Sequence, residues 1–280
     1  MALYRVAAFC DGPAGGNPAG VHLSDRLPEP AQMQHIAAGL GFSETAFAAP
    51  EGDGWRVRYF APTVEVPFCG HATIALGAML AREVREGVHA LQLNAQAITV
   101  EAHRDGERMQ AALQSPPTRS ARLPPARVTD VLALFGWQSG QLDPRLPPAH
   151  VHAGADHLLL AVRDRATLAA MRYDFEAGRR LMKDAGCLTI ALVHAESDQR
   201  FHCRNAFAAG GVYEDPATGA AAAAFAGYLR DIGWPHAGAI DLVQGEDMGR
   251  RSLLHARIDP PAGSSIRVSG GARLMAPDEA

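Results

Sequence analysis

Short apolar runs separated by polar, Gly- and Pro-containing segments predict β-strands along most of the chain. The predicted strands are Tyr4–Phe9, Trp55–Phe60, Ala90–Asn94, Ile98–Ala102, His157–Val162, Leu188–Val193 and Arg251–Ile258. In the segment 90–114, three runs (90–94, 98–102 and 108–114) follow one another with no helical pattern between them. A doubly wound parallel sheet would place a helix after each strand, so this order predicts a mixed α+β fold instead.

Helical periodicity interrupts the strands at several places. The predicted helices are Pro30–Leu40, Ala72–Val84, Asp130–Phe135, Phe175–Asp184 and Thr218–Ile232. The helices at 72–84 and 218–232 are apolar on nearly every face, unlike a helix that lies on a protein surface. We therefore expect each of these two helices to be buried at the centre of its own half of the chain.

An internal similarity of pattern supports two related halves. In both, a strand (WRVRYFAP or RFHCRNAF) leads through a Gly- and Pro-containing loop into an Ala-rich helix. This comparison places His71 and Asp215 at equivalent points of the two units. A true duplication stays open, because the similarity is one of pattern and not of residue identity. The Pro- and Arg-rich segment 115–127 is the predicted boundary, since it offers little to bury. The halves are then 1–117, with a possible contribution from the end of the chain near 266–280, and 118–265.

Composition and charge exclude several classes of protein to which the chain could belong. The 280 residues are 48% hydrophobic and carry a formal net charge of −4, which argues against nucleic acid as a partner. No apolar run is long enough for a membrane span, and the N-terminus lacks the pattern of a signal peptide. Four isolated cysteines form no C-x-x-C pair, so we expect a reduced, cytoplasmic protein.

The starts of the two apolar helices are candidate binding sites for an anion. The first N–H groups of a helix have no partner within it and carry a partial positive charge, which favours a bound carboxylate or phosphate. The candidate substrate-binding residues at these two places are Gly70, Ala72, Thr73, Thr218, Gly219 and Ala220. Ordinary capped, buried helices would show the same pattern.

Titratable residues near these helix starts are the candidate catalytic groups. His71 opens the first helix and Asp215 precedes the second, while Glu214 has the same spacing and is an equal alternative to Asp215. Glu44 leads into an apolar segment, where desolvation would raise its pKa towards the range that proton transfer requires. A solvated Glu at a strand end and a helix-capping Asp are the alternatives.

Cys69 precedes a helix start, where a thiol can have a lowered pKa and act as a base or nucleophile. The second helix start has no cysteine, so a symmetric mechanism with two thiols is not supported, and a small buried residue is the alternative. Nucleotide-binding, phosphate-binding and zinc-protease motifs are absent. We therefore expect neither a metal nor an organic cofactor.

Seven short motifs, in order along the chain, resemble those of the phenazine-biosynthesis (PhzF-like) family. They are GNPAGV (16–21), SETAF (43–47), RYFAP (58–62), FCGHAT (68–73), EDPATG (214–219), QGEDMGRRS (244–252) and VSGGAR (268–273). Each motif alone is weak, but the ordered set spans residues 16–273 and is specific.

The resemblance implies the diaminopimelate-epimerase-like fold. In that fold, two pseudo-symmetric halves each wrap a curved mixed sheet around a central helix, with the active site in the cleft between them. It also implies a homodimer without metal or organic cofactor, and a last strand that returns to the N-terminal half. The family's proton-transferring glutamate corresponds to Glu44, and its substrate-binding histidine and aspartate correspond to His71 and Asp215.

Two departures from the family pattern bear on the substrate. Ala220 stands where serine is common, so one hydroxyl that could bind the substrate is missing, and Arg251 stands where proline is commoner. We expect an isomerase or epimerase that moves a proton on a small, carboxylate-bearing metabolite. The alternatives are an amino-acid epimerase with two bases, one of them Cys69, and a non-catalytic protein that binds a small molecule on the same fold.

Overall fold

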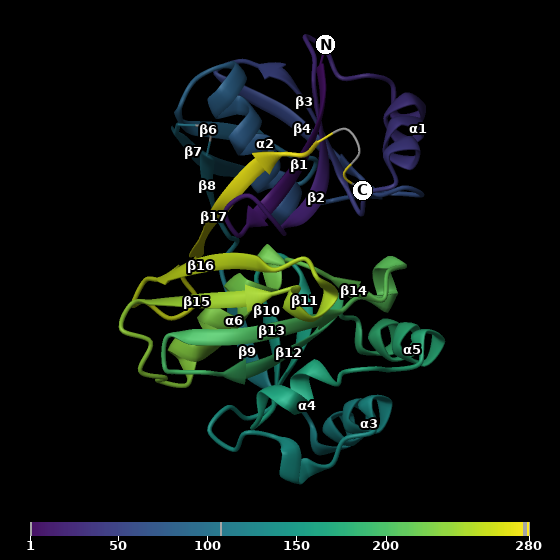
Figure 1. The fold of residues 1–280 in the computed structure, drawn as a ribbon, viewed down its shortest axis with the longest axis vertical. Coiled ribbons are helices and arrows are strands. Elements are labelled where there is room, and N and C mark those ends of the chain that lie inside the picture. Colours follow the sequence, from purple (N-terminus) through teal and green to yellow (C-terminus); the bar gives the residue numbers. More distant parts are fainter. Residues whose placement is uncertain (1, 107, 277–278, 280) are drawn as a thin grey trace. The chain divides into compact units, whose positions relative to one another are not determined.

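A computed structural model describes residues 2–106, 108–276 and 279, which fall into two units (Figure 1). Unit 1 contains the residues up to Gln114, Arg251–Leu253 and the segment from Val268 onward. Unit 2 contains Ser115–Arg250 and Leu254–Arg267. Division of the chain into domains at residues 117 and 118 stays a prediction, because a cluster of contacts does not show that a segment folds independently.

Unit 1 is built mainly from β-strands, with two helices. Its elements are β1 (Ala2–Cys10), β2 (Asn17–Leu23), α1 (Pro30–Leu40), β3 (Thr45–Glu51), β4 (Gly54–Phe60), β5 (Glu65–Val66), α2 (Gly70–Glu83), β6 (Gly87–Gln92), β7 (Ala97–Asp105), β8 (Arg108–Gln114) and most of β17 (Ile266–Leu274).

The strands of unit 1 form a closed ring. Hydrogen-bonded neighbours run β1–β2–β3–β4–β6–β7–β8–β17, and β17 pairs in turn with β1. The β2–β3 and β4–β6 pairs are parallel, whereas β1–β2, β3–β4, β6–β7 and β7–β8 are antiparallel. The sheet is therefore mixed, and the last strand of the chain closes it.

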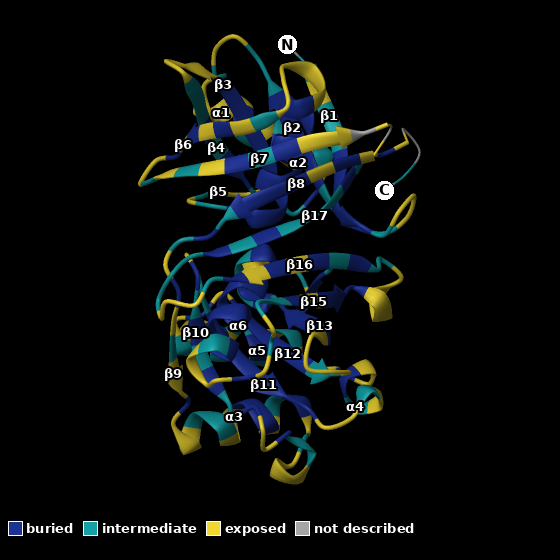
Figure 2. Cartoon of the chain, turned by 90° about the vertical axis from the view of Figure 1, so that its left-hand side faces the viewer, coloured by how far each residue is buried: buried dark blue, intermediate teal, exposed yellow. Residues whose placement is uncertain are grey.

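Helix α2 lies at the centre of this ring, and every residue from Gly70 to Ala81 is buried. It contacts β1, β2, β3, β6, β7 and β8, and Figure 2 shows it in the colour of buried residues. The prediction of a central apolar helix is thus confirmed for this half. Burial on all faces explains why its sequence has no polar stripe.

Unit 2 has more helical structure. Its elements are β9 (Arg119–Arg122), α3 (Pro125–Phe135), a 3₁₀ turn at Ser139–Gln141, β10 (Ala149–His152), β11 (Asp156–Ala161), α4 (Arg165–Ala169), α5 (Phe175–Ala185), β12 (Thr189–Ala195), β13 (Arg200–Ala206), a 3₁₀ turn at Ala208–Gly210, β14 (Glu214–Asp215), α6 (Gly219–Asp231), β15 (Ala239–Gln244), a 3₁₀ turn at Glu246–Met248 and most of β16 (Ser252–Ile258).

The sheet of unit 2 is also mixed and surrounds a central helix. Its neighbours run β9–β10–β11–β12–β13–β15, with parallel pairs at β11–β12 and β13–β15. β16 lies beside β15. The Ile258 N–H, at the end of β16, donates to the carbonyl of Gly238, the residue before β15 (2.8 Å). Helix α6 contacts β9, β10, β11 and β15. The predicted α+β fold, with two similar halves around central helices, is confirmed.

The same local arrangement leads into both central helices. In unit 1, β4 pairs antiparallel with the two-residue strand β5, after which α2 begins. In unit 2, β13 pairs antiparallel with the two-residue strand β14, after which α6 begins. The similarity of pattern in the sequence therefore reflects a repeated strand–strand–helix unit.

The prediction that the segment 115–127 buries little holds for most of its residues, which are exposed or half-buried. Thr118 and Leu123 are buried, and the segment contains β9 and the first turn of α3. Helix α3 begins at Pro125 rather than at Asp130, because proline suits the first helical position, where no N–H partner is needed. Within the described ranges, none of the helices has the length and apolar character that a bilayer crossing requires.

Candidate active site

Glu44 lies just before β3, at the end of the turn that follows α1. Gly41, in the left-handed conformation (φ 70°), ends α1, and the Glu44 carbonyl accepts a hydrogen bond from the Gly20 N–H on β2 (3.2 Å). This backbone bond fixes Glu44 where the parallel β2–β3 pairing begins. Its side chain is buried, with the residue only 8% exposed. The alternative of a solvated strand-end glutamate is therefore wrong.

His71, the second residue of α2, brings its imidazole to this carboxylate. Nε2 of His71 lies 3.5 Å from Oε2 of Glu44 and 3.3 Å from Oγ of Ser43. The Sγ atom of Cys69 lies 3.3 Å from Nδ1 and 4.0 Å from Nε2 of the same ring. A carboxyl, an imidazole and a thiol, all buried, are thus gathered in unit 1 within 4.8 Å of one another.

The environment favours the neutral form of the Glu44 carboxyl. Burial raises the pKa of Glu44 above its usual range, while hydrogen bonds with Ser43 and Cys69 oppose this shift. Oε2 of Glu44 is buried and makes no hydrogen bond among the described residues. A carboxyl with a raised pKa can exchange a proton near neutral pH, which suits general acid–base chemistry.

The start of α2 supplies backbone donors beside these groups. Gly70, His71 and Ala72 hold the first three helical positions, whose N–H groups have no acceptor within the helix. Thr73 differs, because its N–H and its hydroxyl both donate to the Cys69 carbonyl (3.0 and 2.7 Å). The same hydroxyl lies 2.6 Å from the Tyr59 hydroxyl. Thr73 therefore stabilises the turn, and both of its donors are already engaged.

Asp215 is buried in unit 2, on β14, in a network centred on Gln244. The Thr218 hydroxyl donates to Oδ2 of Asp215 (2.5 Å), and Nε2 of Gln244 donates to the Asp215 carbonyl (2.7 Å). The Thr218 N–H donates to Oε1 of Gln244 (3.1 Å). Gln244 thus holds the loop between β14 and α6. Gln244 begins the motif QGEDMGRRS, but the sequence alone did not indicate that its side chain would hold this loop.

The carboxylate of Glu214 is engaged elsewhere. It accepts two hydrogen bonds from the buried guanidinium of Arg204, at 2.9 and 2.5 Å. Arg204 also donates to the Ala169 carbonyl at the end of α4 (2.7 Å). Such a bidentate, buried pair is strongly oriented. Of the two neighbouring carboxylates, Asp215 is therefore the better candidate for chemistry, and Glu214 anchors β14.

The interpretation of His71 and Asp215 as equivalent positions is wrong. Cys69 and Thr218 are the residues that precede the first turns of α2 and α6, so the counterpart of His71 is Ala220. The counterpart of Asp215 on β14 is Val66, the second residue of β5. The two units therefore differ at both places. Unit 1 has an imidazole where unit 2 has Ala220, and unit 2 has a carboxylate where unit 1 has Val66.

The structure brings some of the predicted residues together. Glu44, Cys69 and His71 meet at the first turn of α2, beside Gly70 and Ala72. In unit 2, Asp215 and Thr218 are in contact at the first turn of α6, whose first two residues are Gly219 and Ala220.

Arg251, one of the two departures from the pattern that the family resemblance leads us to expect, donates to the carboxylate of Asp11 in unit 1. This pair joins the loop after β1 to the residue before β16.

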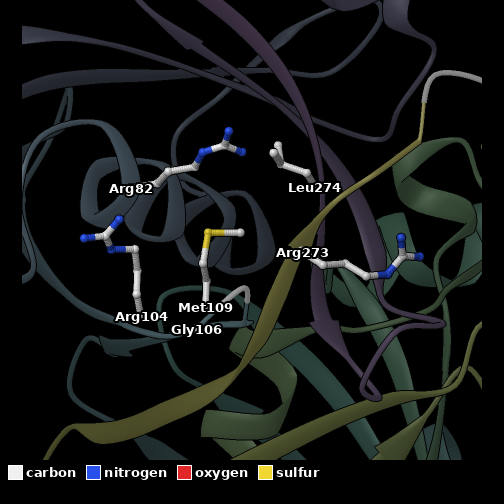
Figure 3. Close-up of a pocket in the computed structure, with 6 residues that line it drawn as sticks. All are labelled: Arg82, Arg104, Gly106, Met109, Arg273 and Leu274. Carbon is white, nitrogen blue, oxygen red and sulfur yellow. The ribbon is translucent and has the colours of Figure 1, made fainter.

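A separate cavity of about 460 Å³ in unit 1 has a different chemistry (Figure 3). It is lined by Arg82, Arg104, Gly106, Met109, Arg273 and Leu274. Figure 3 shows the guanidinium of Arg273 directed away from Arg82 and Arg104. None of the described residues that line it carries a carboxyl, imidazole or thiol, so these residues offer no group for acid–base catalysis.

Comparison with known proteins places this geometry in a family. Residues 6–276 match the family described as phenazine biosynthesis-like protein. The chain belongs to the phenazine biosynthesis-like protein family. Two of the motifs that suggested it, FCGHAT and EDPATG, lie at the starts of α2 and α6 and contain His71 and Asp215, while SETAF, which leads into β3, contains Glu44.

Two curated relatives in this family are named as isomerases. The isomerase YddE of Escherichia coli O157:H7 is 32% identical, over 98% of this chain and 96% of its own length. The trans-2,3-dihydro-3-hydroxyanthranilate isomerase of Pseudomonas fluorescens is 31% identical, over 94% of this chain and 92% of its own. This chain is accordingly an isomerase of the phenazine biosynthesis-like family.

A solved structure agrees on the fold. A predicted epimerase from Pseudomonas aeruginosa superimposes with a TM-score of 0.85, over 98% of this chain and 96% of its own, at 24% identity. At this identity the likeness supports the fold alone. It accords with the two sheets and their central helices.

Proposed function

We propose that this isomerase moves a proton between carbon atoms of a small, carboxylate-bearing metabolite, with Glu44 as the base. The observation that carries the proposal is the buried Glu44 carboxyl, which lies 3.5 Å from the imidazole of His71 at the first turn of α2. Proton transfer within one substrate is electron-neutral, so the reaction requires no redox partner. The named substrate of the Pseudomonas fluorescens relative, a hydroxyanthranilate derivative, belongs to the same chemical class.

Glu44 takes the proton from carbon in its ionised form and returns it to a second carbon in its neutral form. Burial supports this double role, because it brings the two forms closer in free energy at neutral pH. His71 donates a hydrogen bond to a polar group of the substrate and orients it. The N–H groups of Gly70 and Ala72 bind the substrate carboxylate and stabilise the negative charge that develops on deprotonation.

Asp215 is proposed as the second side chain that binds and polarises the substrate. Its carboxylate is held by the Thr218 hydroxyl, and its backbone is held by Gln244. The N–H groups of Gly219 and Ala220, in the first turn of α6, are the proposed donors of unit 2. These roles rest on the geometry of each unit and on the position of both motifs in the family pattern.

Exchange of solvent deuterium into trans-2,3-dihydro-3-hydroxyanthranilate, followed by NMR, tests the role of Glu44. Glu44→Gln keeps the shape of the side chain but cannot accept a proton. We expect exchange to fall by about 10²–10⁴-fold, the usual contribution of a general base. Glu51→Gln, an exposed change at the far end of β3, is the matched control and should exchange like the parent.

The outcomes separate two parts of the proposal. Exchange at the parental rate by Glu44→Gln would exclude Glu44 as the base. Absence of exchange in the parent as well would exclude this substrate, and the same pair of variants would then be examined with other cyclic and amino-acid carboxylates. Asp215→Asn should differ from Glu44→Gln by weakening substrate binding as well as turnover.

A thiol-dependent amino-acid epimerase is the second candidate function. The observation in its favour is the Cys69 thiol, which lies 3.3 Å from Nδ1 of His71. Against it, the matching position in unit 2 is Thr218, so a pair of thiols is absent from these two positions. Cys69→Ser distinguishes the two: it should abolish exchange if the thiol is a base, and reduce it less than about tenfold if Glu44 is the essential base.

Assembly and location remain predictions of the family resemblance and the sequence. We propose a homodimer in the cytoplasm. None of the four cysteines, all buried, forms a disulfide, which supports a reducing compartment. Sedimentation equilibrium of the purified protein tests the dimer, and a single species of about the 29.7 kDa chain mass would contradict it.

A further inference from the structure

The cluster at the first turn of α2 contains three different ligand types for a metal ion. A carboxylate oxygen of Glu44, Sγ of Cys69 and a ring nitrogen of His71 lie within 4.8 Å of one another, and all three residues are buried. Cys69 and His71 are fixed by the helix, whereas Glu44 comes from the start of β3. Sequence spacing gave no sign of this set, because Glu44 is remote from the other two along the chain.

The separations are close to those of a zinc site. Zinc bonds of about 2.0–2.3 Å in a tetrahedron place neighbouring ligand atoms about 3.3–3.8 Å apart. Nε2 of His71 lies 3.5 Å from Oε2 of Glu44 and 4.0 Å from Sγ of Cys69. Sγ of Cys69 lies nearer to Nδ1, at 3.3 Å, so the thiol has to move towards Nε2 and Glu44 to bind the same ion.

A second observation points to a ligand in this place. Oε2 of Glu44 is buried and makes no hydrogen bond among the described residues, although such atoms are normally satisfied. A cation would supply the missing partner for this oxygen. A thiolate with an imidazole and a carboxylate selects zinc over the harder magnesium and calcium ions, which prefer oxygen ligands.

We propose that Glu44, Cys69 and His71 bind one Zn²⁺ ion, with a fourth position left for water, and that the bound ion inhibits the enzyme. Binding replaces the Cys69 S–H bond by an S–Zn bond and the O–H bond of the neutral Glu44 carboxyl by an O–Zn bond; both protons go to solvent, and no oxidation state changes. The inhibitory part rests on the proposed function, because zinc would occupy the lone pair with which Glu44 accepts the substrate proton. The binding part does not depend on it.

Cobalt provides a spectroscopic probe of the site without substrate. Titration of metal-free protein with Co²⁺ should produce thiolate-to-cobalt charge-transfer absorption and the intense visible bands of tetrahedral cobalt, which Zn²⁺ then displaces at one equivalent. Cys69→Ser should lose the charge-transfer absorption and bind Zn²⁺ at least about 100-fold more weakly, since even indirect partners of a metal contribute 10–100-fold. Glu44→Gln should keep the absorption but bind more weakly.

Cys10→Ser is the matched control. Cys10 is also a buried thiol of unit 1, but it belongs to no comparable His, Cys, Asp and Glu group within the described ranges. This variant should keep the absorption and the affinity of the parent. Persistence of the absorption in Cys69→Ser, its loss in Cys10→Ser, or failure of the parent to bind one equivalent of cobalt or zinc would overturn the proposed site.

Deuterium exchange by the parent, measured with and without one equivalent of Zn²⁺, tests the inhibition separately. Exchange should fall on addition of zinc and recover when a chelator removes it. If zinc binds as described and exchange is unaffected, the inhibitory role is wrong while the site stands. If zinc does not bind and Glu44→Gln still lacks exchange, the metal site fails while the proposed function stands.

Discussion

His157, at the second position of β11, is fully buried in unit 2. Its Nδ1 lies 2.8 Å from the Thr189 hydroxyl, which itself donates to Oδ1 of Asn205 (3.1 Å). The hydroxyl proton is thus engaged, so Nδ1 carries the ring proton and donates to Thr189. Burial lowers the pKa of His157 to about 3. The folded protein therefore keeps this imidazole neutral where the unfolded chain would protonate it.

This difference predicts a loss of stability in mild acid. With a folded pKa below the unfolded value of about 6.5, the stability is fully present above pH 6.5 and is lost as the pH falls towards 3. Between pH 7.5 and pH 5 the parent should lose about 2 kcal/mol more than His157→Asn, which keeps a donor near the Nδ1 position but cannot titrate. Urea unfolding of both proteins at both pH values measures the difference. Equal losses would show that His157 does not titrate in this way.

A substitution at Ala220 tests whether the substrate can use a hydrogen bond from a hydroxyl at this position. It is the second residue of α6, at the position where the family resemblance leads us to expect serine. If the substrate is the hydroxyanthranilate derivative, Ala220→Ser should restore one hydrogen bond. Such a bond is worth about 0.5–1.5 kcal/mol, so kcat/KM should rise about 2–10-fold. Steady-state kinetics measure this, with Ala221→Ser as the control one position along the helix. An unchanged kcat/KM would show that the missing hydroxyl is irrelevant to this substrate.

Individual candidate residues could be named from the sequence, but their contacts could not. Glu44 and His71 were identified by motif and by placement, whereas their 3.5 Å separation depends on the parallel pairing of β2 and β3. The predicted equivalence of His71 and Asp215 is wrong because it relied on positions within the two loops. The sequence of a loop does not show at which residue the following helix begins. Only the starts of α2 and α6 fix the correct pairing of positions.

At the scale of an element, α2 is placed by its close approach to β7. A Cβ atom on Gly77 would lie 2.5 Å from Cγ2 of Val100, so alanine there cannot fit without movement. Gly77→Ala should destabilise the protein by about 1–3 kcal/mol, although alanine is the better helix former. Gly39→Ala, in α1 with open space around it, should instead stabilise by about 0.5–1 kcal/mol. Thermal or urea unfolding compares the two, and adding Val100→Ala should partly rescue Gly77→Ala. Equal effects of the two glycine changes would contradict the close packing.

Elements with strong local signals were predicted well. Helix α1 spans Pro30–Leu40 as expected, because proline suits its first position and Gly41 ends it. The strand Asn17–Leu23 was missed, since its Pro and Gly disfavour a strand in isolation. It is held instead by pairing with β1 and β3, which a local pattern does not reveal.

At the scale of the whole molecule, the chain closes the ring of unit 1 only with its last strand. β17 pairs with β1 through Val6↔Leu274, Ala7↔Arg273 and Ala8↔Ala272, and it also pairs with β8. Hydrophobic pattern alone could not predict this closure, because it joins the two ends of the sequence. Our expectation of a returning last strand came from the family resemblance. Contacts so distant along the chain form slowly, since a long loop must be closed before they are gained.

The closed ring predicts that the end of the chain is indispensable for folding. A chain that ends after Arg267 lacks the part of β17 in unit 1 and exposes unpaired edges on β1 and β8, which invite association. It should be recovered mainly as aggregate. A chain that ends after Met275 keeps β17 and the hydrogen bond from the Met275 N–H to the Arg5 carbonyl (2.9 Å), and among the contacts of the described residues it loses the ion pair of Arg273 with Glu279. It should remain soluble and unfold within about 1 kcal/mol of the parent, because a partly exposed ion pair contributes little. Size-exclusion chromatography and urea unfolding compare the three proteins, and a monodisperse, cooperatively unfolding chain ending at Arg267 would show that unit 1 does not need β17 to fold.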